Sequence, residues 1–385
     1  KLIPMKNNIF LSIVLILTSS CSTLAFWSDD SDVEVIEPVP LQSFKNDYQI
    51  SLEWKKSFKG ENSLGSFKPS FYSGNMLIAE PEGNIFSINP ISGKENWKIN
   101  LNRELAAGVA SGFGKLIVSD VNGFVIAIDS ETQEIIWEKN IGGEVLSNAV
   151  VSASLIIVKN SVGELVALNA LSGDKKWSFR SQLPALTVRG TGESIIENGI
   201  VFSTFDNGRM GAFQLETGFF LWDAPISFVE GSSELENLID ADSAPVLAKQ
   251  LIFATNYQGN LTAFDIAQKR PVWNSKSSSF YSPVVANNMI MAIQDNGSIL
   301  SFSLANLAPS WTSEEYLRRE LSSGAAYKNL LLVGDLDGYV HAINPMTGMT
   351  AGRKKVSSNP IMSIVTFREF AYVIDQESNI AAIKL

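Results

Sequence analysis

Histidine and cysteine, on which much enzyme chemistry depends, occur once each in this sequence, as His341 and Cys21. One residue of each type cannot build a His/Cys zinc site, an internal disulfide, a Cys–His dyad or the attachment motif of a c-type haem. The chain of 385 residues also carries a formal charge of −10. Because an acidic surface repels phosphate backbones, this composition argues against a nucleic-acid partner.

The single cysteine follows an amino-terminal segment with the pattern of a secretory signal. Lys6 supplies a positive charge, and the apolar run at 9–17 is too short to span a bilayer as a helix. The run leads into LTSSC, small residues before a cysteine, which look like the processing site of a bacterial lipoprotein. We interpret 1–20 as a signal peptide and Cys21 as the lipidated residue. A plain signal peptide that is cleaved after Ala25 is the alternative.

The residues after the cysteine predict an anchor and a tether. Ser22 stands next to the cysteine, and the absence of an aspartate there resembles lipoproteins that are sorted to the outer membrane. The protein would then be lipid-anchored on the periplasmic face of that membrane. The following residues are rich in acids, include prolines and show little periodicity. We therefore interpret 21–48 as the lipidated cysteine and a flexible tether, and 49–385 as the folded body.

From residue 49 onward the sequence repeats itself. A seventh unit has Gly352 where a tryptophan would stand, and an eighth starts at Ser378. Apolar and polar residues alternate on both sides of each turn glycine, as in half-buried strands. Four strands in roughly 40 residues indicate one blade of a propeller. In six units a tryptophan stands 14 residues after a turn glycine: Gly83–Trp97, Gly123–Trp137, Gly163–Trp177, Gly208–Trp222, Gly259–Trp273 and Gly297–Trp311.

The two ends of the repeat region complement each other. The last unit lacks a tryptophan strand, whereas the body opens with an unmatched one that ends in Trp54. If that strand completes the blade that begins at Ser378, the ring closes without an unpaired edge. The sequence therefore predicts an all-β fold, an eight-bladed β-propeller of four-stranded antiparallel blades, closed by the N-terminal strand. The tryptophans are interpreted as core residues between blades rather than as ligand platforms.

Two connections break the regular spacing. The distance from a tryptophan to the next turn glycine is 24 to 29 residues, except for 31 after Trp177 and 37 after Trp222. Both excesses fall between a tryptophan strand and the first strand of the next blade. Because such connections emerge on one face of a propeller, we expect the two loops to be neighbours there. Loops that exceed their repeat template on a rigid scaffold are candidate binding sites.

The two long loops carry side chains that suit a protein contact. Leu186 and Val188 are apolar anchors beside Arg189, a fork-shaped donor, and the second loop holds Asp240 and Asp242. These residues form the candidate partner-binding site. The alternative is that Arg189 pairs with one of the two aspartates and merely ties the loops together.

The repeat resembles the quinoprotein-type (PQQ-like) propeller. From the cysteine onward, the chain is similar to a family of lipoprotein subunits of the bacterial outer-membrane β-barrel assembly (BAM) machinery. The resemblance is carried by PALTVRG at 184–190, DNGRMGA at 206–212, GSSELENLIDADSAP at 231–245, YQGNLTAFD at 257–265 and VGDLDGYVHAIN at 333–344.

This resemblance implies a non-catalytic scaffold without a cofactor, a monomer within a hetero-complex. It implies binding to the periplasmic POTRA domains of BamA and a role in the folding and insertion of β-barrel proteins. Unfolded barrel clients are further candidate partners. The family's contact positions fall on Leu186, Val188, Arg189, Asp240 and Asp242. Val188 stands where the family pattern has leucine, so this anchor is shorter.

Two other functions remain open for the same repeat. Known PQQ-dependent dehydrogenases carry a vicinal cysteine pair against the cofactor and a calcium site, whereas this sequence has only Cys21. A ligand-binding periplasmic propeller would use surplus aromatic residues in its loops, although most of those available here stand where blade cores need filling. Fold alone decides neither function. The available aromatic residues are Phe219, Phe220, Phe228, Phe280 and Tyr281.

Overall fold

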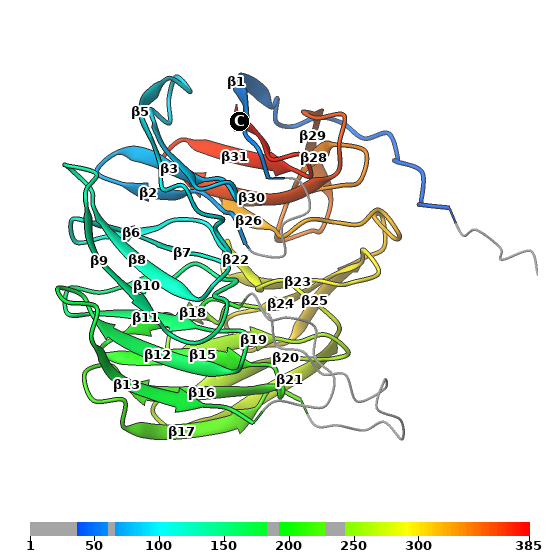
Figure 1. The fold of residues 1–385 in the computed structure, drawn as a ribbon. Helices are drawn as coiled ribbons and strands as arrows, with labels where there is room; N and C mark the ends of the chain where they lie inside the picture. Colours follow the sequence, from blue (N-terminus) through cyan, green and yellow to red (C-terminus); the bar gives the residue numbers. More distant parts are fainter. Residues whose placement is uncertain (1–36, 61–65, 183–191, 228–242) are drawn as a thin grey trace, which may run out of the picture. The chain divides into compact units, whose positions relative to one another are not determined.

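The computed structural model describes residues 37–60, 66–182, 192–227 and 243–385. Within these ranges the chain forms 32 β-strands, arranged as eight antiparallel sheets of four strands each. Each sheet is one blade of a propeller (Figure 1). The predicted fold class is confirmed. No helix in the described ranges is long and apolar enough to cross a membrane.

The blades are numbered in chain order, and within each the strands run from the innermost to the outermost. The innermost strands contact one another between blades 1, 2 and 3 and again between blades 6, 7 and 8. From blade 1 to blade 8 they are β2 (Ser70–Tyr72), β6 (Ala110–Gly112), β10 (Val150–Val151), β14 (Ile195–Glu197), β18 (Val246–Ala248), β22 (Val284–Ala286), β26 (Ala325–Tyr327) and β30 (Ile361–Phe367). The second strands are β3 (Asn75–Ala79), β7 (Lys115–Ser119), β11 (Leu155–Lys159), β15 (Ile200–Phe205), β19 (Leu251–Thr255), β23 (Met289–Ile293), β27 (Leu330–Gly334) and β31 (Phe370–Asp375).

The third and fourth strands complete each blade on the outside. The third strands are β4 (Asn84–Ile88), β8 (Phe124–Asp129), β12 (Glu164–Asn169), β16 (Arg209–Gln214), β20 (Gly259–Asp265), β24 (Ile299–Ser303), β28 (Tyr339–Ile343) and β32 (Asn379–Lys384). The outermost strands are β5 (Glu95–Asn100), β9 (Ile135–Asn140), β13 (Lys175–Arg180), β17 (Phe220–Pro225), β21 (Arg270–Ser277), β25 (Pro309–Ser313), β29 (Thr350–Lys355) and β1 (Ser51–Ser57).

Blade 8 is made from both ends of the chain. Strand β1 pairs antiparallel with β32, so that Ser51 lies opposite Lys384 and Trp54 opposite Ala382. In Figure 1 the blue β1 lies beside the red C-terminal strands. The N-terminal strand therefore supplies the outer strand that blade 8 lacks, and the predicted closure of the ring is confirmed.

Among the described residues, the hydrophobic core consists of eight clusters, and each cluster joins two adjacent blades. Between blades 2 and 3, for example, Val125 and Trp137 of one blade pack with Val158 and Leu168 of the next. The middle strands bury both faces, and every residue of β11 is buried. Because burial of apolar surface stabilises at about 25 cal/mol per Å², these contacts between blades stabilise the ring.

The repeat tryptophans pack at these blade boundaries, as the sequence predicted. Trp137 of blade 2 donates its indole N–H to the carbonyl oxygen of Ala170 in blade 3 at 3.1 Å. Gly173 in the same turn has a φ of +72°, and a Cβ there would lie 2.5 Å from the Trp137 ring. Glycine is therefore required both for the backbone conformation and for the close approach of the ring. The same indole bond is made by Trp54, Trp177 and Trp311.

The described end of the predicted tether contacts the propeller. The backbone N–H of Val39 donates to the carbonyl oxygen of Leu317 at 3.1 Å, and that of Tyr48 donates to Ala351 at 3.0 Å. In the structure the compact unit runs from Pro38 to Leu385. It therefore includes residues 38–48, which the sequence pattern assigned to a flexible tether.

Candidate protein-binding site

The predicted lipidation and contact residues lie outside the described residues, so their roles stay predictions. The described chain on either side of each long loop shows where that loop is attached. The residues concerned are Cys21, Leu186, Val188, Arg189, Asp240 and Asp242.

The two long connections are attached to blade 4 from both sides. The first joins β13, the outer strand of blade 3, to β14, the inner strand of blade 4. The second joins β17, the outer strand of blade 4, to β18, the inner strand of blade 5. The two attachment points are therefore neighbours in the ring, as the spacing of the repeat predicted.

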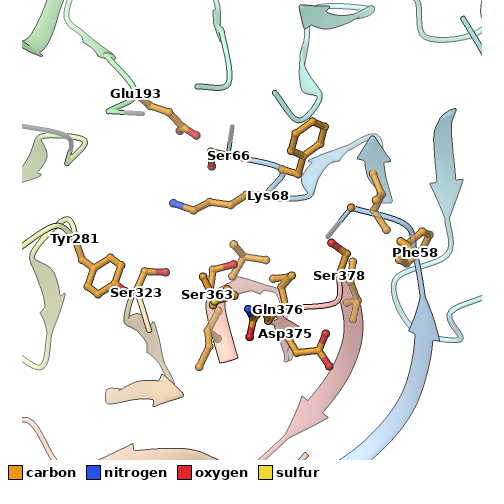
Figure 2. Close-up of a pocket in the computed structure, with 18 of the residues that line it drawn as sticks. Phe58, Ser66, Lys68, Glu193, Tyr281, Ser323, Ser363, Asp375, Gln376 and Ser378 are labelled. Atoms are coloured by element: carbon orange, nitrogen blue, oxygen red, sulfur yellow. The ribbon is translucent and has the colours of Figure 1, made fainter. Parts of the chain in front are cut away.

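The described ends of these connections reach a cavity of about 520 Å³ in the middle of the ring. Glu193 follows the first long loop, Ser243 follows the second, and both line this cavity. Figure 2 shows the side chains of Lys68 and Glu193 extending toward each other, with Tyr281 and Ser323 nearby. The lining thus combines hydroxyl groups, aromatic rings and charged groups from several blades.

The polar groups around Glu193 are incompletely paired. Burial raises the pKa of the Glu193 carboxyl above its ordinary value, while the Lys68 ammonium and the backbone N–H of Asn148 oppose this shift. The side-chain oxygen of Asn148 is buried and has no hydrogen-bond partner among the described residues. A buried oxygen without a partner in this position is typical of a place where an ordered water completes the hydrogen bonds.

The residue types in the described part of the cavity suit recognition by hydrogen bonds. Within the described ranges, no group of three or more His, Cys, Asp or Glu side chains could hold a metal ion. His341 lies in blade 7, where Asp335 and Arg353 contact its two ring nitrogens. The serine hydroxyls of the cavity therefore lack a histidine base that could activate them.

Lys68 and Glu193 were not among the residues predicted from the sequence. Each stands just before an innermost strand, β2 or β14, at a position that faces the centre of the ring. The one available signal was a charged residue next to a short innermost strand. That signal is weak because charged residues are common in every connection of a propeller.

Comparison with solved structures defines the class of protein. The structure of BamB from Moraxella catarrhalis matches with a TM-score of 0.79 at 20% identity, covering 87% of this chain and 100% of that chain. A quinohemoprotein alcohol dehydrogenase from Comamonas testosteroni matches with a TM-score of 0.69 at 13% identity, covering 87% and 76%. At such identities the matches show the fold alone. The chain thus shares the propeller fold of these proteins, a fold that hosts different functions.

Sequence similarity identifies the family within that class. The family model described as "Outer membrane protein assembly factor BamB" matches residues 81–313. Outer membrane protein assembly factor BamB of Pseudomonas aeruginosa is 34% identical over 328 residues, which cover 85% of this chain and 86% of that protein. The factor of the same name from Kangiella koreensis is 32% identical over 345 residues, covering 89% and 87%. The chain belongs to the BamB family, as the resemblance predicted.

Proposed function

We propose that this chain is a non-catalytic scaffold of the outer-membrane β-barrel assembly machinery. In this role it binds the POTRA domains of BamA and aids the folding and insertion of β-barrel proteins. The observation that carries the proposal is the attachment of both long loops to blade 4, with flanking residues that line one cavity. A rigid ring with two enlarged loops at one place is well suited to hold a partner. Membership in the BamB family supports the assembly role.

The chemistry of the two loops fits a protein partner. Leu186 and Val188 provide apolar anchors, which give most binding energy when they lie at the centre of an interface. Arg189 provides a forked donor, and Asp240 and Asp242 accept hydrogen bonds from a basic or amide-rich edge. Such charged groups set the orientation and register of the partner.

A dehydrogenase function is supported by the fold alone. The quinohemoprotein enzyme matches at 13% identity. The sequence has no cysteine apart from Cys21, so it cannot supply the vicinal pair that the resemblance to such enzymes would require. These observations favour the scaffold function over a redox reaction in the central cavity.

Co-purification tests the proposed partner. The intact protein is extracted from membranes in mild detergent and purified, and the proteins that accompany it are identified by mass spectrometry. We expect BamA among them, because the scaffold function requires a lasting contact. Folded protein that is recovered repeatedly without BamA would contradict the proposal.

We also propose that Cys21 is lipidated and holds the protein at the periplasmic face of the outer membrane. One acyl chain binds membranes only marginally, so stable retention requires the several chains of a bacterial lipoprotein. Cys21→Ala should therefore move the protein into the soluble periplasmic fraction, as measured by fractionation and immunoblotting. Ser22→Ala is the matched control and should stay in the membrane. Recovery of Cys21→Ala in membranes washed free of peripheral proteins would argue against lipidation.

A further inference from the structure

Blade 7 departs from the repeat at its outermost strand. Its β29 carries Gly352, and a Cβ at that position would lie 2.8 Å from the carbonyl oxygen of Tyr48. The backbone N–H groups of Asp47 and Tyr48 both donate to the carbonyl oxygen of Ala351, at 2.8 and 3.0 Å. The backbone of Asp47 and Tyr48 thus lies where a side chain at position 352 would stand. The other seven blades carry a tryptophan in the outermost strand: Trp54, Trp97, Trp137, Trp177, Trp222, Trp273 and Trp311.

This upstream backbone belongs to residues 38–48, which we call the strap. At its other end, the Val39 N–H donates to the carbonyl oxygen of Leu317 at 3.1 Å. Nη1 of Arg319 donates a hydrogen bond to the carbonyl oxygen of Val39 at 3.2 Å. Leu41 packs against the hydrophobic cluster between blades 6 and 7. The strap therefore makes contacts at both ends and has an apolar anchor between them.

A second arginine, Arg353 of β29, holds the middle of the strap. Its Nη1 donates to the carbonyl oxygen of Gln42 at 2.8 Å. Its guanidinium carbon lies 4.8 Å from the centre of the Phe44 ring, within the range of a cation–π contact. One side chain thus binds the strap by a backbone bond and by an aromatic contact.

The two arginines are themselves held by a buried network. Arg319 donates from Nε to Asp335 at 2.9 Å, and Asp335 also bonds Nε2 of His341 at 3.0 Å. Arg353 donates from Nε to Nδ1 of His341 at 2.9 Å and from Nη2 to Glu315 at 3.0 Å. Asp335 and His341 are fully buried. These partners fix the orientation of both guanidinium groups, so that the remaining N–H groups point toward the strap. This lowers the entropic cost of binding the strap.

We propose that the outer side of blade 7 is a binding groove for the strap, and that the strap takes the place of the missing tryptophan and fixes where the tether leaves the propeller. The groove consists of Leu317, Arg319, Ala351, Gly352 and Arg353. The occupant is an extended segment of the same chain, recognised by its backbone carbonyl groups, Leu41 and Phe44. Glycine at 352 is then required because any side chain would displace the strap.

The consequence for anchoring rests on the proposed lipidation of Cys21. A chain spans at most about 3.3–3.6 Å per residue. A tether that started at Gln49 would reach about 100 Å from the lipidated cysteine, whereas one that starts at Pro38 reaches about 60 Å. The strap therefore shortens the reach of the anchor and makes it leave from the rim at blades 6 and 7.

Hydrogen exchange on the full chain tests the groove. Gly352→Trp restores the tryptophan that the other blades carry at this position, but its side chain would collide with the strap. Arg353→Ala removes one of the two arginines that contact the strap. In both variants the backbone amides of Val39, Asp47 and Tyr48 should exchange about tenfold faster or more than in the wild type. The amides of β27 serve as the internal reference for global unfolding. Lys354→Ala, a neighbouring exposed residue in the same strand, is the matched control and should leave exchange unchanged.

The result separates the groove from the proposed function. Strap amides that exchange in the wild type as fast as in an unstructured peptide would overturn the proposal. Unchanged protection in Arg353→Ala would do so too, even if Gly352→Trp failed to fold. The measurement requires neither a lipid nor BamA and can be repeated in Cys21→Ala. A failure of lipidation or of partner binding would therefore leave its outcome intact.

Discussion

His341 is held in its neutral form from both ring nitrogens. The Nε–H of Arg353 can only donate, so Nδ1 of His341 must accept and the ring proton resides on Nε2, facing Asp335. Burial lowers the pKa of His341 most, the guanidinium groups of Arg353 and Arg319 lower it further, and Asp335 opposes them. The ring of Tyr316 lies 4.8 Å away, and burial raises the pKa of that tyrosine to about 12, so it stays neutral at ordinary pH.

Protonation of His341 should make stability depend on pH. Below the ordinary pKa of 6.5, the imidazole of His341 takes up a proton in the unfolded chain but resists it in the folded chain. The contribution of His341 to the free energy of unfolding is therefore complete above pH 6.5 and declines below it. The free energy of unfolding should fall by up to about 1.4 kcal/mol per pH unit from this residue. Urea denaturation between roughly pH 7.5 and pH 5 measures the slope, and His341→Gln should flatten it. If the free energy of unfolding depended equally on pH in the wild type and in His341→Gln, protonation of His341 would not be the cause of that dependence.

Single residues differed in how well the sequence predicted them. The tryptophans at blade boundaries were predictable because the same residue recurs at the same spacing. A large ring that recurs in this way fills the space between adjacent blades, which also recurs around the propeller. The network of Asp335, His341 and Arg353 occurs in one blade and has no periodic signal. The sequence could establish which sites a lone histidine excludes, but its buried partners depend on the register of β27, β28 and β29.

At the scale of elements, the ring depends on β1. This strand is the outermost of blade 8 and pairs along its length with β32. Deletion of residues 49–58, or truncation before Ser378, would leave backbone N–H and C=O groups without partners. Either change should lower the melting temperature by many degrees or prevent folding, as measured by circular dichroism. Deletion of residues 22–36 is the control and should leave melting nearly unchanged; equal melting of all four proteins would contradict closure by β1.

The sequence predicted the strands better than the strap. Strands were recognisable from alternation and from turn glycines that recur in every unit. Residues 38–48 have no such period, and their composition resembles a tether. They contact Leu317, Arg319, Ala351 and Arg353, which lie about 280 or more residues further along the chain. Such distant contacts cannot be predicted from the local sequence. A flexible tether up to residue 48 was therefore the natural but incomplete interpretation.

At the scale of the whole molecule, the closed ring provides a rigid frame for the two long loops. Eight hydrophobic clusters join each blade to the next, so blade 4 is fixed on both sides. The points at which the loops are attached were predictable by counting residues between tryptophans and glycines. The cavity beside them was not, because most innermost strands have only two or three residues and their ends meet across the ring. Lys68 and Glu193 come from different blades, and no spacing in the sequence relates them.

The central claim is that the long loops beside blade 4 bind BamA. Two double variants, Leu186→Ala with Arg189→Ala and Asp240→Ala with Asp242→Ala, remove anchors and charges without touching a described core residue. Leu171→Ala is the matched control, because it removes an exposed leucine from the turn before β13, at the opposite end of that strand from the first long loop.

The most direct measurement is the dissociation constant for a purified POTRA fragment of BamA, determined by calorimetry beside the melting temperature of each protein. Each double variant should bind about tenfold to a hundredfold more weakly, since the loss of two interface contacts costs roughly 1.4–2.8 kcal/mol. Melting temperatures should stay close to that of the wild type, and Leu171→Ala should bind normally. A loss of several degrees would instead show that Arg189 and the aspartates tie the loops to each other. Wild-type affinity in both double variants would contradict the claim.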